Sequence, residues 1–114
     1  MEPTKIYISG KITGLPINDA RHFFREGEIK AKKLNLISPA ETVNPMTIPH
    51  PRAHALEEAH ASEEEIWNAY MEGCIAALLT CDAIYMLKNW GDSKGARVEY
   101  AIAKELGLTI HYEE

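Results

Sequence analysis

Three short apolar runs and one weaker run alternate with longer amphipathic stretches along the chain. Residues 5–9 (KIYIS), 82–87 (DAIYML) and 108–112 (LTIHY) are rich in β-branched and aromatic side chains, and residues 35–38 (NLIS) form the weaker run. Short and nearly continuous apolar runs are typical of strands that are covered on both faces of a parallel sheet. The pattern therefore predicts four strands.

Three longer segments carry an apolar stripe at helical spacing. The first is expected to begin at Asn18 or Asp19, acting as the cap, and to run to about residue 34. The second follows the hydroxyl cap Ser62 and has acidic residues in its first turn, where the helix dipole favours them. The third covers about residues 96–106 and is terminated by Gly107.

The order of these elements predicts the fold class. Strands and helices alternate, which indicates a single α/β domain over residues 1–114, with a doubly wound, mostly parallel sheet of four to five strands and helices on both faces (Rossmann or flavodoxin-like). In such sheets the ligand lies beyond the carboxyl ends of the strands. The loops at that edge are GKITG at 10–14, a proline-rich segment and KNWGDSKG at 88–95. We expect the functional site there.

The proline-rich segment, at about residues 39–61, shows no hydrophobic period. Four prolines interrupt it, at positions 39, 45, 49 and 51. A connection this long inside a small domain is usually a functional lid or binding loop when it is not disordered. We therefore expect an irregular loop.

Three histidines in this segment raise the question of a metal site. His50, His54 and His60 lie close to Glu57 and Glu58 in the sequence. A spacing of four places two ligands on one helical face, but the neighbouring prolines disfavour a regular helix and no cysteine or HExxH pattern accompanies the histidines. A solvated loop or lid is favoured over a metal site, and we expect neither a metal nor a cofactor.

Composition and charge limit the classes of binding partner and the cellular compartment that we expect. A net charge of −5 argues against binding to a nucleic acid polymer, although a few local donors would suffice for a small phosphorylated ligand. The sequence shows no signal-peptide pattern and no apolar run that would cross a bilayer, so we expect a cytoplasmic protein without a membrane partner. Cys74 and Cys81 lie seven residues apart in a predicted helical segment, too far for a disulfide, and are expected to be reduced and mostly buried.

The loop after the first strand is a candidate ligand-binding turn. Gly10 and Gly14 would let the backbone approach a ligand, and exposed amides with Lys11 and Thr13 would contact a phosphate. The pattern is neither a Walker loop nor a dinucleotide fingerprint. A plain strand-to-helix turn therefore stays open as the alternative.

The loop before the last helix contains a second set of candidates. Gly95 permits close approach, and Ser93 is placed either to cap the helix or to bind an anion at its positive end. Glu99 follows one turn later, where a carboxylate is positioned to attack a sugar carbon as in retaining glycosidases. The alternative for Glu99 is an ordinary acid of the first helical turn.

Aromatic side chains offer a stacking surface for a base. Trp90 lies in the loop before the last helix, where its indole either stacks on a base or covers the sheet edge or a subunit contact. Trp67 and Tyr70 lie on the apolar stripe of the preceding helix and are interpreted as core or interface residues.

Two segments together resemble a known enzyme superfamily. KIYISGKITG and CDAIYMLKNWGDSKGARVEYAIAKELG are similar to the nucleoside 2-deoxyribosyltransferase superfamily, which includes the deoxynucleoside 5′-monophosphate N-glycosidases. The similarity extends to an uncharacterised, phage-rich branch of small proteins with the pattern W-x-x-S-x-G-A-x-x-E. It covers about the first fifteen residues and the C-terminal forty, but not the proline-rich segment.

The resemblance implies roles for individual residues. It places Glu99 at the nucleophilic glutamate and Tyr7 at the strand tyrosine that orients that glutamate. Gly10 falls on the glycine of the ligand-facing loop, and Ser93 on the serine that contacts the 5′-phosphate. Asp82 matches an acid at the start of the third strand and is expected to be structural.

The chain departs from the family pattern at two places. The general-acid aspartate of the family is replaced in the stretch Glu72-Gly73-Cys74, so Glu72 and Asp92 are the remaining candidates for the acid, since a thiol is a poor proton donor to a leaving base. The phosphate-loop serine and arginine are replaced by Lys11 and Thr13, which retains a positive charge but loses the arginine fork.

The resemblance implies cleavage or transfer at the N-glycosidic bond of a nucleoside or its 5′-monophosphate, through a glutamate nucleophile. It also implies a homo-oligomer (dimer or higher), because related sites borrow residues from a neighbouring subunit and the chain is small. The alternative is a non-catalytic protein that binds a nucleotide or a nucleotide-derived signal, as a sensor or a phage sponge. An inert structural module is a third interpretation.

Overall fold

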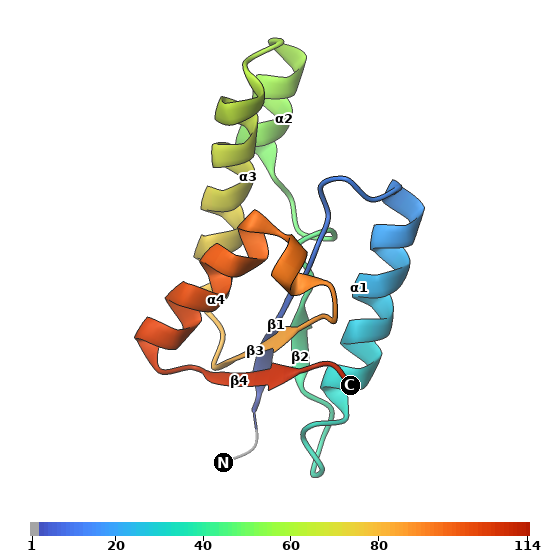
Figure 1. Ribbon diagram of the computed structural model, residues 1–114. Helices are drawn as coiled ribbons and strands as arrows, with labels where there is room; N and C mark the ends of the chain where they lie inside the picture. Colours follow the sequence, from blue (N-terminus) through green and yellow to red (C-terminus); the bar gives the residue numbers. More distant parts are fainter. Residues whose placement is uncertain (1–2) are drawn as a thin grey trace.

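The computed structural model describes residues 3–114 and contains one parallel sheet. Its four strands are β1 (Lys5–Ser9), β2 (Glu41–Val43), β3 (Ala83–Met86) and β4 (Thr109–Tyr112), arranged in the order β2-β1-β3-β4. Each neighbouring pair is parallel. The winding direction changes beside β1, since the chain goes from β1 to β2 on one side and returns to β3 on the other (Figure 1). The predicted doubly wound α/β fold, Rossmann or flavodoxin-like, is confirmed.

Within residues 3–114, four α-helices and one short 3₁₀ helix complete the fold. They are α1 (Ile17–Lys32), α2 (Pro51–Glu58), α3 (Glu63–Leu78), α4 (Lys94–Leu106) and the 3₁₀ helix η1 (Trp90–Asp92). Figure 1 shows α1 on one side of the sheet and α3 and α4 on the other. The helices therefore cover both faces of the sheet.

The alternation of side chains along β1 divides the core into two halves. Ile6 and Ile8 pack with Phe24 of α1, whereas Tyr7 packs with residues of α3 and α4. All three β1 side chains are fully buried, as expected for a strand between two layers of helices. Ser9, two positions after Tyr7, points to the same face of the sheet as Tyr7.

The second strand lies later in the chain than expected. Residues 35–38 form a turn in which the Asn35 side chain accepts hydrogen bonds from the backbone N–H groups of Ile37 and Ser38, so this segment does not pair with β1. The neighbouring Leu36 and Ile37 side chains are exposed. Pairing with β1 instead begins at Glu41. The prediction of a strand at 35–38 was wrong, because asparagine stabilises a local turn in competition with the sheet.

The proline-rich segment is also more ordered than expected. It contains β2 and the helix α2, and Pro51 occupies the first turn of α2, where a proline costs no helical hydrogen bond. The prediction of an irregular loop was therefore wrong. Helix α1 begins at Ile17 with no side-chain cap, so Asn18 and Asp19 lie inside its first turn.

Two predicted helix boundaries are confirmed. The Ser62 hydroxyl accepts a hydrogen bond from the Glu65 backbone N–H and caps α3. Gly107 ends α4 in the left-handed conformation, with φ of +73°.

Helices α2 and α3 form a hairpin that projects beyond the carboxyl edge of the sheet (Figure 1). The projection gives the molecule its long axis, with extents of 46 × 28 × 23 Å. Among residues 3–114, no helix combines the length and apolar character that a bilayer crossing requires. Cys74 and Cys81 are both free and buried, as predicted.

Candidate functional site

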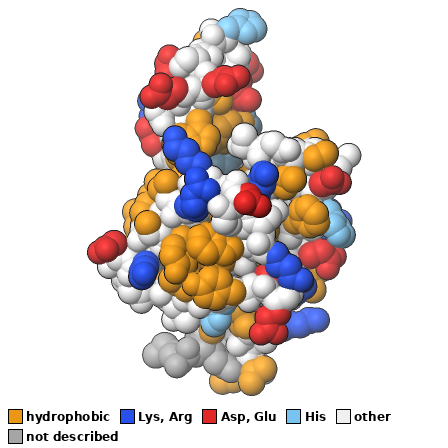
Figure 2. All heavy atoms as spheres, viewed as in Figure 1, with side chains coloured by type: hydrophobic (Ala, Val, Ile, Leu, Met, Phe, Trp, Pro, Cys, Tyr) orange, Lys and Arg blue, Asp and Glu red, His pale blue; other side chains and the backbone are white. Residues whose placement is uncertain are grey.

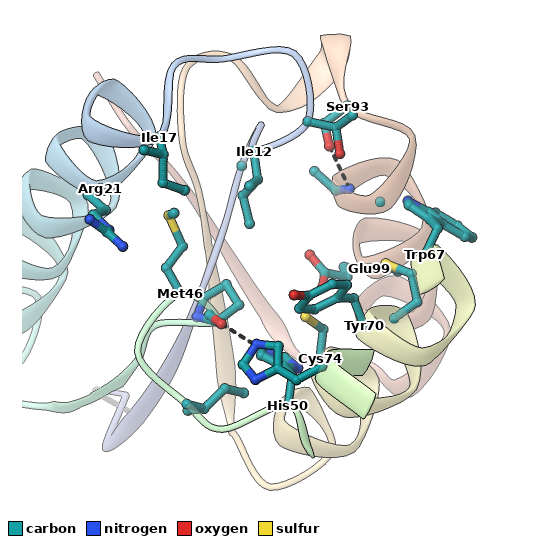
Figure 3. A pocket seen from close by; sticks show the side chains of 18 residues that line it. Ile12, Ile17, Arg21, Met46, His50, Trp67, Tyr70, Cys74, Ser93 and Glu99 are labelled. Atoms are coloured by element: carbon teal, nitrogen blue, oxygen red, sulfur yellow. Dashed lines mark hydrogen bonds between the residues drawn. The ribbon is translucent and has the colours of Figure 1, made fainter. Parts of the chain in front are cut away.

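A cavity of about 470 Å³ opens at the carboxyl edge of the sheet. It lies between α1, the segment that follows β2, the α2–α3 hairpin and the start of α4 (Figure 3). Ile12, Ile17 and Met46 lie on one side, and Trp67, Tyr70 and Glu99 lie on the other. This volume is within the usual range of small-molecule sites, and an apolar lining with few polar groups is typical of them.

Glu99 is the one carboxylate among the described side chains that line the cavity. It comes from the second turn of α4 and is only 5% exposed. The Tyr7 hydroxyl donates a hydrogen bond to Glu99 Oε2 over 2.7 Å, and the Ser9 hydroxyl donates one to Oε1 over 2.7 Å. Both donors come from β1, so the first strand and the last helix meet at this carboxylate, and the contact predicted between Tyr7 and Glu99 is present.

Two opposing effects set the ionisation of Glu99. Burial raises the pKa of this carboxyl, and the hydrogen bonds from Tyr7 and Ser9 lower it without fully compensating. Burial and the nearby Glu99 charge also raise the pKa of Tyr7 well above its usual value. Tyr7 therefore remains a neutral hydrogen-bond donor.

Cys74 of α3 lines the cavity beside this group. It lies in the stretch where the family resemblance implied a general-acid aspartate. Burial raises the pKa of its thiol to about 11, so it remains protonated at neutral pH. It is therefore neither a ready nucleophile nor an efficient acid.

The two predicted proton donors lie outside the cavity. Glu72 faces α2, where it pairs with Arg52, and its side chain is 59% exposed. Positions 72 and 74 are about 200° apart around a helix, so Cys74 and Glu72 point in nearly opposite directions. Asp92 lies in η1 and is exposed. The structure thus brings neither acid to Glu99.

The predicted binding residues divide into two groups. Gly10, Thr13, Ser93 and Gly95 line the cavity. The Ser93 hydroxyl also accepts a hydrogen bond from the Ala96 backbone N–H over 3.1 Å and caps α4.

Lys11 and Gly14 lie in the same loop but do not line the cavity. The Lys11 backbone N–H donates to the Asn89 side chain, which joins the loop after β1 to the loop after β3. Gly14 has φ of +89° and allows the chain to turn into α1.

Trp90 lies away from the cavity. Its ring stacks on Tyr100 with centroids 4.6 Å apart, and Tyr112 of β4 lies at 6.4 Å from both rings. This arrangement corresponds to the interpretation in which Trp90 covers the sheet edge. A large hydrophobic patch is visible in the same region in the space-filling view (Figure 2).

Sequence reasoning missed several cavity residues. Trp67 and Tyr70 line the cavity rather than the core, and the Lys94 ammonium lies 4.4 Å from the centroid of the Trp67 ring. Arg21 of α1 is the one lining side chain with a fixed positive charge among the described residues. Ser9, which contacts Glu99 without lining the cavity, was also missed, although its position two residues after Tyr7 on a strand predicts that both side chains lie on one face.

Two of the three histidines line the cavity. His50 is buried, and its Nε2 donates to the Pro45 carbonyl over 2.8 Å, which fixes the imidazole between α2 and α3. His54 follows one turn later and lies edge-on to Tyr70. His60 is exposed at the end of α2. Within residues 3–114, no group of three or more His, Cys, Asp or Glu side chains is placed to hold a metal ion.

Asp82 has the structural role expected of it. Its carboxylate accepts hydrogen bonds from the Thr4 hydroxyl and from the backbone N–H groups of Thr4 and Lys5. These bonds fasten the start of β1 to the start of β3, at the edge of the sheet remote from the cavity.

Comparisons with known proteins give a family but no function. Neither the curated proteins nor the solved structures contain a match to this chain. A family model described as "Domain of unknown function (DUF4406)" matches residues 4–112, which is nearly the whole chain. The chain therefore belongs to the DUF4406 family.

Proposed function

We propose that the protein cleaves or transfers the N-glycosidic bond of a nucleoside or a nucleoside 5′-monophosphate, with Glu99 as the nucleophile. The observation that carries this proposal is the buried Glu99 carboxylate at the cavity wall, held by the Tyr7 hydroxyl at 2.7 Å. The resemblance of both ends of the chain to the nucleoside 2-deoxyribosyltransferase superfamily supports it. No cofactor is needed for this chemistry.

The reaction proceeds in two displacements. A Glu99 oxygen attacks C1′ of the sugar, the bond from C1′ to the base nitrogen breaks, and the base leaves with the electron pair and takes up a proton from water. Water, or a second base, then attacks C1′ of the glycosyl ester, gives up a proton to solvent and releases the Glu99 carboxylate. Tyr7 orients Glu99 in both steps and is not itself consumed.

The cavity walls suit a nucleoside-sized ligand. Trp67 and Tyr70 offer aromatic surface, and base–aromatic stacking contributes about 1–3 kcal/mol per base. Thr13, Ser93 and Arg21 provide hydroxyl and guanidinium groups along the walls for the sugar or a phosphate. The homo-oligomer suggested by the resemblance stays a prediction.

The test is release of free base. The protein is incubated with each common nucleoside and deoxynucleoside and with their 5′-monophosphates, and the products are separated by chromatography. Glu99→Gln should reduce base release by about three orders of magnitude or more, because the nucleophile is lost. Glu105→Gln, an exposed acid on the same helix, is the control and should retain activity. Full activity in Glu99→Gln would refute the proposal.

A second function is supported by the positions of the acids. Glu72 and Asp92 lie outside the cavity, so among the described residues no second carboxylate is there to protonate a leaving base. A protein with this cavity would serve as a sensor or sequestering protein for a nucleotide or nucleotide-derived signal. Calorimetry that detects tight binding of a nucleotide, together with chromatography that detects no free base, would favour this function over catalysis.

A further inference from the structure

Ser9 makes a contact that the proposed reaction leaves unexplained. Its hydroxyl donates to Glu99 Oε1 over 2.7 Å, while Tyr7 donates to Oε2 over the same distance. Ser9 is fully buried, and Glu99 is nearly so. Each oxygen of the carboxylate therefore has its own hydroxyl donor, and the group is fixed at both oxygens rather than at one.

The geometry of β1 explains how two hydroxyls reach one carboxylate. Side chains at positions 7 and 9 of the chain lie on the same face of the strand, roughly 7 Å apart at their bases. The long Tyr7 ring and the short Ser9 side chain start from different points of the strand and end at the same group. Ile8, between them, points into the opposite half of the core.

We propose that Ser9 is a positioning residue for Glu99, which holds the plane of the carboxylate and stabilises its ionised form at the cavity wall. This inference rests on the proposed function, in which the Glu99 carboxylate is the nucleophile. A nucleophile held in one orientation loses less entropy on reaching the transition state. A free carboxylate would rotate about its terminal bond and present its oxygens in many directions.

Ser9 also affects the ionisation of Glu99, because the carboxylate is buried. A buried carboxylate loses its hydration, and hydrogen bonds must replace it if the charge is to persist. Among residues 3–114, Tyr7 and Ser9 are the side chains that donate to Glu99. The other titratable or charged groups around it are Cys74 of α3 beside it and four that line the same cavity: Tyr70 of α3, Arg21 of α1, His50 directly before α2 and His54 of α2.

The experiment measures the titration of Glu99 directly. The full chain is labelled with ¹³C at the glutamate carboxyls, and the Glu99 resonance is identified by its loss in Glu99→Gln. In Ser9→Ala we expect Glu99 to titrate at higher pH than in the wild type, because the ionised form loses one donor. Ser9→Thr keeps the hydroxyl and should return the titration toward the wild-type position.

Base release provides a second readout. In Ser9→Ala, kcat should fall by about 10- to 100-fold with little change in KM, and the acid limb of its pH profile should move upward with the titration. Ser62→Ala is the matched control, since it removes a hydroxyl that caps α3 and does not contact Glu99. It should leave the Glu99 titration unchanged.

The outcomes separate this inference from the proposed function. An unchanged Glu99 titration in folded Ser9→Ala overturns the positioning role, whatever the activity. If the titration moves as expected but the wild type releases no base from any nucleoside or nucleotide, Ser9 still orients Glu99 and the proposed reaction is wrong.

Discussion

At the scale of single residues, the central feature is a carboxylate that is buried in spite of its charge. Burial raises the pKa of Glu99, so the folded protein favours its protonated form more than the unfolded chain does. The contribution of Glu99 to the free energy of unfolding is therefore fully present below the pKa of a glutamate in an unfolded chain. It is lost as the pH rises through the higher pKa that Glu99 has in the folded protein. Tyr7 and Ser9 reduce this loss but do not remove it.

Glu99→Gln removes the buried charge, so the variant should be more stable than the wild type by an amount that depends on pH. Glutamine has nearly the same shape and no charge, so the difference in unfolding temperature between the variant and the wild type should increase from pH 4 to pH 8. Thermal unfolding followed by circular dichroism at several pH values measures it. A constant difference across that range would show that Glu99 is not destabilised by burial. Glu105→Gln, on the exposed face of α4, should show no such trend.

At the scale of secondary-structure elements, the strongly periodic segments could be predicted and the locally ambiguous ones could not. β1, β3, α3 and α4 follow from apolar runs, a serine cap and a terminating glycine. The prediction of a strand at 35–38 was wrong because the Asn35 side chain forms a turn with the backbone of the next three residues. The helix after position 51 was missed because Pro51 was taken as a helix breaker, whereas it starts the helix.

The packing of α2 on α3 depends on a glycine. A Cβ at Gly73 would lie 2.8 Å from His50 Nδ1, closer than such atoms approach in proteins. Gly73→Ala should therefore destabilise the protein by about 1–3 kcal/mol, although alanine favours the helix, because the imidazole must shift within the hairpin. Urea unfolding measures the change. Gly91→Ala is the control, since a Cβ there meets no atom within 4 Å. Equal stability of the two variants would contradict this prediction.

At the scale of the whole molecule, the parallel topology determines where the site lies. Because the carboxyl ends of β1 and β3 meet at one edge, the sequence alone places Tyr7, Gly10, Ser93 and Glu99 near one another. It could not show that Glu72 faces away from the cavity, because that depends on the rotation of α3 about its axis. For the same reason, the sequence could not show that Trp67 and Tyr70 line the cavity.

The opposite edge of the sheet is held by Asp82, which joins the first strand to the third. Burial alone would raise its pKa, but hydrogen bonds from the Thr4 hydroxyl and the N–H groups of Thr4 and Lys5 outweigh burial and lower it. Its stabilisation is therefore present above the unfolded pKa of aspartate and is lost as the pH falls through the folded value.

Asp82→Asn should lower the free energy of unfolding by about 1 kcal/mol at pH 7, a modest figure because the group is largely exposed. The difference should shrink as the pH falls below the unfolded pKa of aspartate and toward the lower folded value, because the wild-type carboxylate is then progressively protonated. Urea titrations at pH 7 and pH 3 measure both values. A difference that is the same at the two pH values would exclude the ionised carboxylate as its source.

The two sides of the cavity come from different parts of the fold. The hydroxyls that hold Glu99 belong to β1, which is paired on both sides, whereas Trp67, Tyr70 and His54 belong to α2 and α3. Substitutions in the hairpin can therefore change the side chains on that wall while the buried Glu99 carboxylate keeps its contacts with β1. Among homologues we expect the hairpin side of the cavity to diversify faster than positions 7 and 9, so that one scaffold accommodates divergent ligands.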